Sequence, residues 1–167
     1  MRILSLALLM LLLSASSAVA QDGLGFQGAG VRAGFRIDPD QFLVGGQLDL
    51  GDITRNLRLM PNATIGFGDH LTLISIDPEV HYCFRDNPIG AGTWFYAGGG
   101  IDFVYTKIDV PEAAEPFVDD SDTSVGVSLT GGLSHQLGSS QSIMGELRIV
   151  LEDEAFFEIV GAWNFGR

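Results

Sequence analysis

The sequence is poor in several residue types that large classes of protein require. Its 167 residues contain one cysteine, Cys83, which excludes an internal disulfide framework and any zinc site built from several cysteines. Positive charge is also scarce, because nine Lys and Arg stand against 21 Asp and Glu, a formal net charge of −12. Binding to nucleic acid depends on clustered Lys and Arg that release counterions from phosphates, so we expect no nucleic-acid partner. With 46% hydrophobic and 18% charged residues, the chain is too apolar to be disordered.

Long apolar runs are missing except at the N-terminus. Arg2 is followed by an apolar run over 3–13 and by the small residues Ala18-Val19-Ala20. This order is typical of a secretory signal peptide, and the run is too short to anchor the chain in a bilayer, which takes ~20 residues. We therefore expect residues 1–20 to be cleaved and residues 21–167 to form a single domain. The mature chain keeps eight Lys and Arg against 21 Asp and Glu, a net charge of −13.

Helical periodicity is hard to find in the mature chain, whereas apolar residues alternate with small or polar ones throughout. The clearest segment sets Ile74, Ile76 and Val80 against Ser75 and Asp77. Turn-forming residues separate eight such segments, which cover 28–37, 42–51, 57–68, 74–85, 94–105, 125–134, 143–152 and 157–165. Eight long antiparallel strands in chain order predict an all-β, up-and-down barrel with no helix.

Two barrels fit this pattern, and they differ in which face of each strand points inward. A soluble, lipocalin-like barrel would bury the apolar face, whereas a transmembrane barrel would turn that face to lipid. The polar face carries eleven of the 22 glycines, and small residues suit the narrow interior of eight strands. Its arginines and carboxylates nearly balance, as a closed polar interior requires. Aromatic residues of the apolar face gather near both strand ends, which is typical of the two girdles of a membrane barrel. We therefore predict a transmembrane barrel, with the soluble barrel as the alternative.

The expected interior follows directly from this facing. We predict an interior polar network that consists of Arg32, Arg36, Asp49, Arg58, Asp77, Glu79, His81, Arg85, Asp102, Glu146, Arg148 and Glu158.

The chain resembles the small bacterial outer-membrane β-barrel families of the OmpA membrane-domain or OmpX kind. The resemblance rests on the signal peptide, the strand count, the alternation, and a last strand that ends in Trp163-Asn164-Phe165. It implies an integral protein of the Gram-negative outer membrane, with lipid around it. Members usually finish on an aromatic residue that the barrel-assembly machinery recognises; here Gly166 and Arg167 follow Phe165.

An even number of strands puts both termini on the periplasmic side. The external connections are then 38–41, 69–70, 108–122 and 153–155, and they hold eleven of the 21 acidic residues. The simplest interpretation of these acidic connections is a solvated loop surface, but they could also collect divalent cations that bridge lipid phosphates. The longest connection is the candidate for contact with a surface partner, through Pro111, Phe117, Asp119, Asp120 and Asp122. Its acidic cluster lacks the glycine spacing of a calcium loop.

No pattern in the sequence predicts catalysis, a cofactor or a metal site. Asp77, Glu79, His81 and Cys83 share one face of a strand, but same-face neighbours lie about 6.6 Å apart, which suits an ion-pair ladder better than a metal. Ser134 and His135 are adjacent, so they face opposite sides of the strand and cannot act together on lipid. We therefore expect a monomeric, non-enzymatic barrel with a structural or surface-interaction role. A lipid-modifying outer-membrane enzyme and a narrow channel are further alternatives.

Overall fold

The protein is an all-β barrel in a computed structural model that describes residues 23–68, 71–108, 121–152 and 154–166. The strands are β1 (Leu24–Ile37), β2 (Gln41–Thr54), β3 (Leu57–Leu59), β4 (Asn62–Gly68), β5 (Leu71–Asp77), β6 (Glu79–Cys83), β7 (Thr93–Ile108), β8 (Ser121–Gln136), β9 (Gln141–Leu151) and β10 (Ala155–Gly166). Within the described residues, no helix is long and apolar enough to cross a membrane. The expected signal peptide over 1–20 lies outside them.

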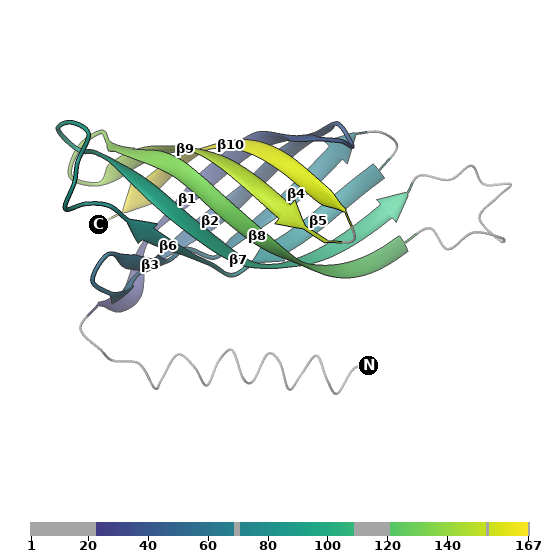
Figure 1. The fold of residues 1–167 in the computed structure, drawn as a ribbon, viewed down its shortest axis with the longest axis horizontal. Helices are drawn as coiled ribbons and strands as arrows, with labels where there is room; N and C mark the ends of the chain where they lie inside the picture. Colours follow the sequence, from purple (N-terminus) through teal and green to yellow (C-terminus); the bar gives the residue numbers. More distant parts are fainter. Residues whose placement is uncertain (1–22, 69–70, 109–120, 153, 167) are drawn as a thin grey trace, which may run out of the picture.

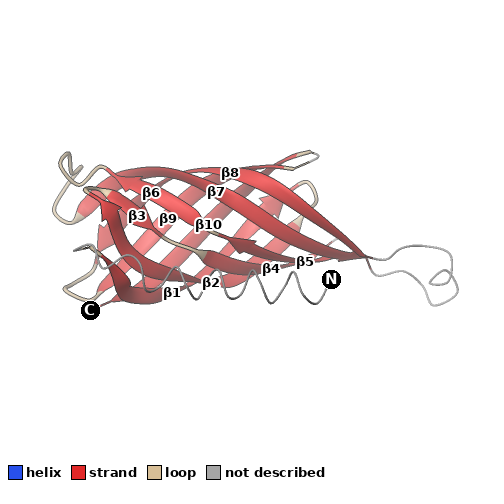
Figure 2. Ribbon diagram, turned by 90° about the horizontal axis from the view of Figure 1, so that it is seen from below, coloured by secondary structure: helices blue, strands red, loops and turns tan. Residues whose placement is uncertain are grey.

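The strands close into a ring of eight, in which each barrel strand pairs antiparallel with the strands before and after it in the chain. β3 and β4 together form one barrel strand, because both pair with β2; β5 and β6 form the next, because both pair with β7. The ring closes where β1 pairs with β10, in a register that joins Val31 to Trp163 and Ile37 to Phe157. Figures 1 and 2 show the resulting cylinder of tilted strands. The eight-stranded antiparallel up-and-down barrel predicted from the sequence is confirmed.

Proline interrupts two of the eight barrel strands. Pro61 lies between β3 and β4, and Pro78 lies between β5 and β6. A proline has no amide hydrogen for the strand ladder, so each breaks the regular pairing at its own position. The ladder is bridged through their carbonyl groups, which accept from the amides of Leu48 (2.9 Å) and Ile101 (3.4 Å). The sequence predicted each of these barrel strands as continuous.

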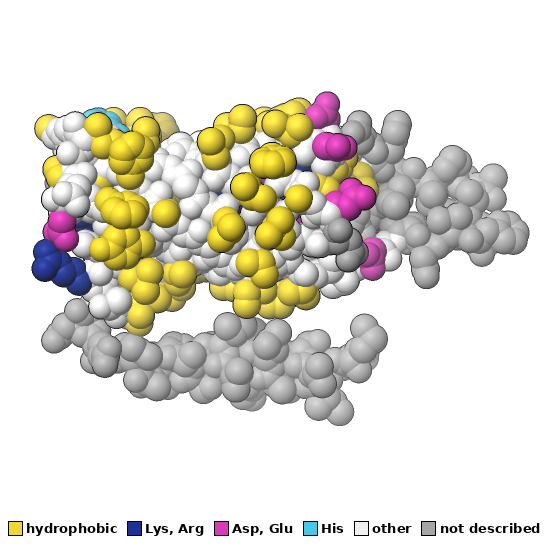
Figure 3. Space-filling model, in the orientation of Figure 1, with side chains coloured by type: hydrophobic (Ala, Val, Ile, Leu, Met, Phe, Trp, Pro, Cys, Tyr) yellow, Lys and Arg dark blue, Asp and Glu magenta, His cyan; other side chains and the backbone are white. Residues whose placement is uncertain are grey.

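The apolar face of every strand points outward, as the alternation predicted. Outward-facing Val31 and Leu129 are 59% and 56% exposed, whereas their neighbours Arg32 and Ser128 are 4% and 0% exposed. Yellow apolar side chains cover the outer wall in two belts, separated by a paler zone around the middle of the barrel (Figure 3). The barrel is therefore apolar outside and polar inside, the reverse of a water-soluble protein.

Strands β7 and β8 form the longest hairpin. The end of the barrel at which β7 finishes and β8 begins is called here the β7–β8 end (Figure 1). The opposite end, where β10 finishes and where β3 and β6 also lie, is called the C-terminal end. β8 begins at Ser121, so the prediction that Asp122 belongs to a connecting loop is wrong. Asp122 is an exposed strand residue whose backbone pairs with Thr106, because the β7–β8 ladder extends further than the apolar alternation does.

Glycine makes room for Tyr96, a large aromatic ring that is enclosed by the barrel. The Tyr96 ring from β7 lies over Gly132 of β8, and a Cβ at Gly132 would come within 2.6 Å of the Tyr96 ring and hydroxyl. The hydroxyl donates to the Glu146 carboxylate (2.7 Å). Gly131, the preceding residue, faces outward into open space.

We expect Gly132→Val to displace the Tyr96 ring and destabilise the barrel by about 1–3 kcal/mol, the usual cost of overpacking. Urea unfolding of the refolded protein in detergent micelles measures the change. Gly131→Val is the matched control, because the added side chain meets nothing within 4 Å and should change stability by less than ~0.5 kcal/mol. Equal losses in the two variants would contradict the packing of Tyr96 over Gly132.

Candidate functional site

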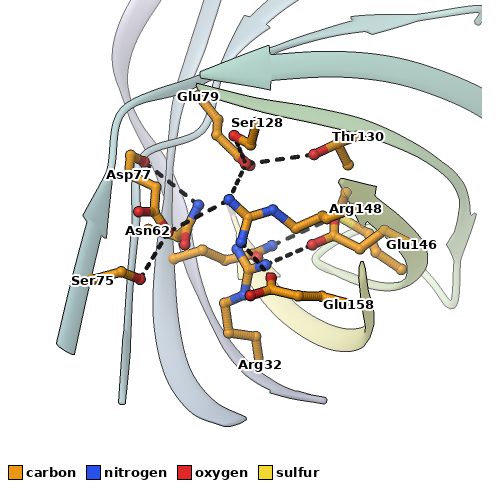
Figure 4. Close-up of polar contacts among 12 residues, drawn as sticks. Arg32, Asn62, Ser75, Asp77, Glu79, Ser128, Thr130, Glu146, Arg148 and Glu158 are labelled. Atoms are coloured by element: carbon orange, nitrogen blue, oxygen red, sulfur yellow. Dashed lines mark hydrogen bonds and ion pairs between the residues drawn. The ribbon is translucent and has the colours of Figure 1, made fainter. Parts of the chain in front are cut away.

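The centre of the barrel interior is one arginine surrounded by four carboxylates. Arg148 projects inward from β9, and its Nη2 lies 2.7 Å from Glu79, 2.8 Å from Asp102 and 3.6 Å from Asp77. Its Nη1 lies 2.8 Å from Glu158 of the neighbouring β10. All five side chains are at most 2% exposed. Figure 4 shows Arg148 between Asp77 and Glu79, which belong to one barrel strand, and Glu158, which belongs to another.

Two of these carboxylates flank Pro78 on one barrel strand. Asp77 ends β5 and Glu79 begins β6, so both point inward on either side of the proline. Hydroxyl groups hold them in place: Ser75 donates to Asp77 (3.0 Å) and Ser128 donates to Glu79 (3.3 Å). Neither carboxylate therefore depends on Arg148 alone for its orientation.

A second buried ion pair lies next to the central cluster. Arg32 Nη2 lies 2.6 Å from Glu146 Oε1, and the Tyr96 hydroxyl donates to the other oxygen of Glu146 (2.7 Å). The His81 ring stacks on Tyr96 with 4.8 Å between centroids, and its Nε2 lies 3.1 Å from Glu79 Oε2. His81 and Tyr96 thus connect this pair to the central cluster.

A third arginine joins the cluster from the β7–β8 end. Arg36 donates from Nε (2.9 Å) and from Nη2 (2.7 Å) to Glu158 Oε1, so Glu158 is held by two arginines. The Arg36 guanidinium also lies over the Phe156 ring, 5.0 Å from its centroid. Nine of the twelve predicted network residues lie fully inside the barrel: Arg32, Arg36, Asp77, Glu79, His81, Asp102, Glu146, Arg148 and Glu158.

The other three predicted residues meet at the C-terminal end, where they are partly exposed. Arg58 lies 3.0 Å from Asp49, and Arg85, in the turn after β6, lies 2.7 Å from Asp52. Asp52 also approaches Arg58 (3.6 Å), although the sequence placed it in a turn rather than in the network. The reason is Gly51, whose positive φ of 81° belongs to an irregularity in the β1–β2 pairing and ends the simple alternation. In the sequence, this irregularity is signalled only by the presence of a glycine at position 51.

One ion pair lies wholly outside the barrel wall at the same end. Arg55 donates to the exposed Asp86 carboxylate (2.9 Å), and Asn56 donates to its second oxygen (2.9 Å). These two hydrogen bonds, with the charge of Arg55, lower the pKa of Asp86. Asp86 is therefore ionised throughout the neutral range.

The two ends of the interior differ in chemistry. At the β7–β8 end, four apolar side chains close over the ionic cluster: Leu43, Leu73, Val104 and Val150. At the C-terminal end, a cavity of about 130 Å³ opens instead, with Met60, Trp94, Ser134 and Met144 in its wall. Side chains thus fill the interior at the β7–β8 end and at its centre, and a cavity remains at the C-terminal end.

Ser134 and His135 point to different sides of the barrel wall, as the sequence predicted. Ser134 is buried in the interior, whereas His135 is half-exposed on the outer side with its Nδ1 2.7 Å from the Thr93 hydroxyl. In the described part of the chain, no three His, Cys, Asp or Glu side chains are grouped so that they could hold a metal ion. The predicted contact residues Pro111, Phe117, Asp119 and Asp120 lie outside the described residues.

Known proteins share the fold without a close sequence relationship. No protein-family model matches the chain, and no curated protein matches it in sequence. Neisserial surface protein A superposes with a TM-score of 0.68 at 13% identity, over 88% of this chain and all of that one. The N-terminal β-barrel domain of Pseudomonas aeruginosa OprF superposes with a TM-score of 0.61 at 15% identity, over 86% of this chain and 99% of that one. A designed transmembrane β-barrel superposes with a TM-score of 0.50 at 13% identity, over 84% of this chain and 96% of that one. The likeness to small outer-membrane barrels is therefore confirmed for the fold.

We expect Arg148→Met to be severely destabilising. The substitution keeps an unbranched apolar stem but leaves four buried carboxylates without their shared cation, and breaking a buried pair in this way costs ~3–5 kcal/mol or more. The yield of refolded barrel and its unfolding midpoint in urea measure the effect. Arg55→Met, which breaks the exposed pair with Asp86, is the control and should cost less than ~1 kcal/mol. Comparable small losses in both variants would mean that the central cluster does not hold the barrel together.

Proposed function

We propose that the protein is an integral outer-membrane β-barrel with a closed polar interior and a structural or surface-interaction role, and that it has no catalytic activity. The observation that carries the proposal is the inverted distribution of side chains. Large apolar residues are exposed on all eight barrel strands, while arginines and carboxylates are buried within. Monomeric soluble proteins rarely leave apolar patches of more than a few hundred Å² in water, so this coat needs lipid around it.

The outer wall has the dimensions and composition that a bilayer requires. Strands of about ten residues with a tilt of ~40° cover roughly 25 Å, the height of the apolar band in such barrels. Exposed aromatic residues lie towards both ends of the strands: Phe35, Phe42 and Phe103 towards the β7–β8 end, and Tyr82, Phe95 and Trp163 towards the other. The soluble ligand-binding barrel is disfavoured, because it would have to expose this surface to water.

The filled interior argues against an open channel. The ionic cluster around Arg148 and the apolar layer at the β7–β8 end occupy the lumen of a barrel that is only just wide enough for side chains. We infer that the barrel conducts no ions in its resting state. Single-channel recording in planar bilayers tests this, and an open current specific to the parent protein would contradict it.

We infer that the β7–β8 end is external. Most exposed acidic residues of the described part lie there, namely Asp38, Asp40, Asp122 and Glu154, whereas Asp86 lies at the C-terminal end. Figure 3 shows acidic side chains gathered mainly at the β7–β8 end. A rim of this charge could collect divalent cations that bridge lipid phosphates. The longest connection, between β7 and β8, is at the same end and is the candidate for contact with a surface partner. The last strand, β10, carries Trp163 and Phe165 stacked on the outer wall, the part that the barrel-assembly machinery would recognise.

Membrane fractionation combined with heat-modifiable gel mobility is the direct test of the proposal. A folded membrane barrel should sediment with the outer membrane and migrate faster before boiling than after it. Recovery in the soluble periplasmic fraction would overturn the membrane assignment in favour of the soluble barrel.

We expect Leu129→Arg to impair membrane insertion and Ser128→Ala to be mild. Leu129 faces outward near the middle of β8, where a charge exposed to lipid costs ~2–4 kcal/mol, whereas Ser128 faces the interior. The fraction of folded protein in lipid vesicles measures both. Equal tolerance at the two sites would mean that the outer wall does not face lipid.

A further inference from the structure

The cavity at the C-terminal end of the interior adjoins a second space beside it. The cavity has a volume of about 130 Å³, and the neighbouring space, called here the side hollow, has a volume of about 410 Å³. Three residues line both of them: Arg58, Trp94 and Gln136. Sites for small molecules are usually clefts of ~300–1,000 Å³. A ligand that lies across the cavity and the side hollow would therefore contact these three residues.

The guanidinium group of Arg58 is available to such a ligand. At this end of the barrel, Arg85 donates two hydrogen bonds to Asp52, of 2.7 and 3.1 Å. Arg58 Nε lies 3.0 Å from Asp49 Oδ1 but does not hydrogen-bond to it. Among the described residues, none accepts a hydrogen bond from the Arg58 guanidinium, and its side chain is 27% exposed. Its N–H groups can therefore donate to acceptors in the cavity.

The wall formed by β7 and β8 presents an aromatic ring and further hydrogen-bonding groups. Trp94 is half-buried and pairs in register with Ser134, and Gln136 follows on the same face of β8. In the described part of the chain, these three side chains have no hydrogen-bond partner. Neutral amide and hydroxyl side chains line the rest of the cavity: Gln27, Ser139, Ser140, Gln141, Ser142 and Asn164. The opening thus combines one aromatic ring with many neutral polar groups.

The charges around the cavity and the side hollow cancel. Arg58 and Arg85 stand against Asp49 and Asp52, which they contact, and the chain as a whole has a net charge of −12. A carboxylate or phosphate group would lie close to Asp49 and add negative charge without a partner, whereas a cation would meet Arg58. A neutral ligand with several oxygen atoms meets neither penalty. The electrostatics therefore favour a neutral, oxygen-rich ligand.

We propose that the cavity and the side hollow bind a neutral saccharide, with one sugar ring on Trp94 and hydroxyl oxygens that accept from Arg58. One face of a sugar ring carries C–H groups, which pack against the electron-rich face of an aromatic ring. Sugar hydroxyls both donate and accept, as the surrounding amides and hydroxyls do. The saccharide is either free or the end of a glycan chain. Only its location in the periplasm rests on the proposed orientation, and binding itself is independent of whether the barrel resides in a membrane.

The two tryptophans of the chain allow a matched test, because Trp163 lies on the outer wall. Trp163→Phe leaves Trp94 as the only tryptophan, and Trp94→Phe leaves Trp163. Both barrels are refolded in micelles of a detergent without a sugar headgroup, and their folding is checked by heat-modifiable gel mobility. They are titrated with maltose, cellobiose and N,N′-diacetylchitobiose. We expect at least one disaccharide to change the emission of Trp94 with a Kd of about 10 mM or tighter, and none to change that of Trp163.

Calorimetry with the disaccharide that binds then tests the individual residues. Arg58→Gln and Trp94→Ala should each weaken binding at least about tenfold. Trp163→Ala and Arg55→Gln are the controls, because Trp163 and Arg55 line neither the cavity nor the side hollow, and both should leave the affinity unchanged within about twofold. The Trp163→Phe titration covers the case in which a variant of the cavity does not fold.

Three results would overturn the proposal: no disaccharide binds, Trp163 responds as strongly as Trp94, or glucuronic acid or glucose 6-phosphate binds more tightly than the neutral sugars. The last result would mean an anion site. The tetrasaccharide of the sugar that binds distinguishes the two sources. Affinity at least equal to that of the disaccharide supports a glycan-chain end, and lower affinity supports a free saccharide. Because these measurements use micelles, their failure is distinct from a failure of the membrane assignment, which fractionation tests.

Discussion

The interior of this barrel depends on the ion pairs that Arg148 forms. Its guanidinium is shared by carboxylates from β5, β6, β7 and β10, so one side chain on β9 joins the adjacent β10 to strands that the backbone ladder connects to β9 only through β8. The interior of an eight-stranded barrel is only just wide enough for side chains, so a buried charge here needs a counter-charge from another strand. The remaining parts of the network, Arg32 with Glu146 and Arg36 with Glu158, are arranged around this centre.

The narrow lumen also explains why the interior is layered. Small residues must stand wherever a large side chain crosses the lumen, and Gly132 beneath Tyr96 is the clearest instance. Apolar side chains close the β7–β8 end, ions fill the middle, and the cavity at the C-terminal end remains open to its own side. The interior is thus closed by side chains at one end and hollow at the other.

Much of the fold could be predicted, because period-two alternation in eight segments specifies both the strands and their facing. Val31 and Arg32, or Ser128 and Leu129, face opposite sides in the structure as the pattern required. The partners of the charged residues could not be predicted. The sequence predicted members of the network but not their pairing: Asp77 and Glu79 meet Arg148, Arg32 pairs with Glu146, and Arg58 and Arg85 share Asp52. Alternation specifies the side of the strand on which a residue lies. Which residues of different strands lie opposite each other across the interior depends on the register of the closed barrel.

The sequence by itself determined the class of the molecule: an apolar coat, a polar and glycine-rich inner face, and acidic residues concentrated in the connections at one end. These follow from local patterns, because a residue's side of a strand depends only on its position in the alternation. The tertiary structure alone decided what meets across the lumen. Closure brought Arg148 to four carboxylates and brought Arg58 and Trp94 to one cavity, because contacts between distant strands depend on register, on the breaks at Pro61 and Pro78 and on the irregularity at Gly51, none of which the alternation encodes.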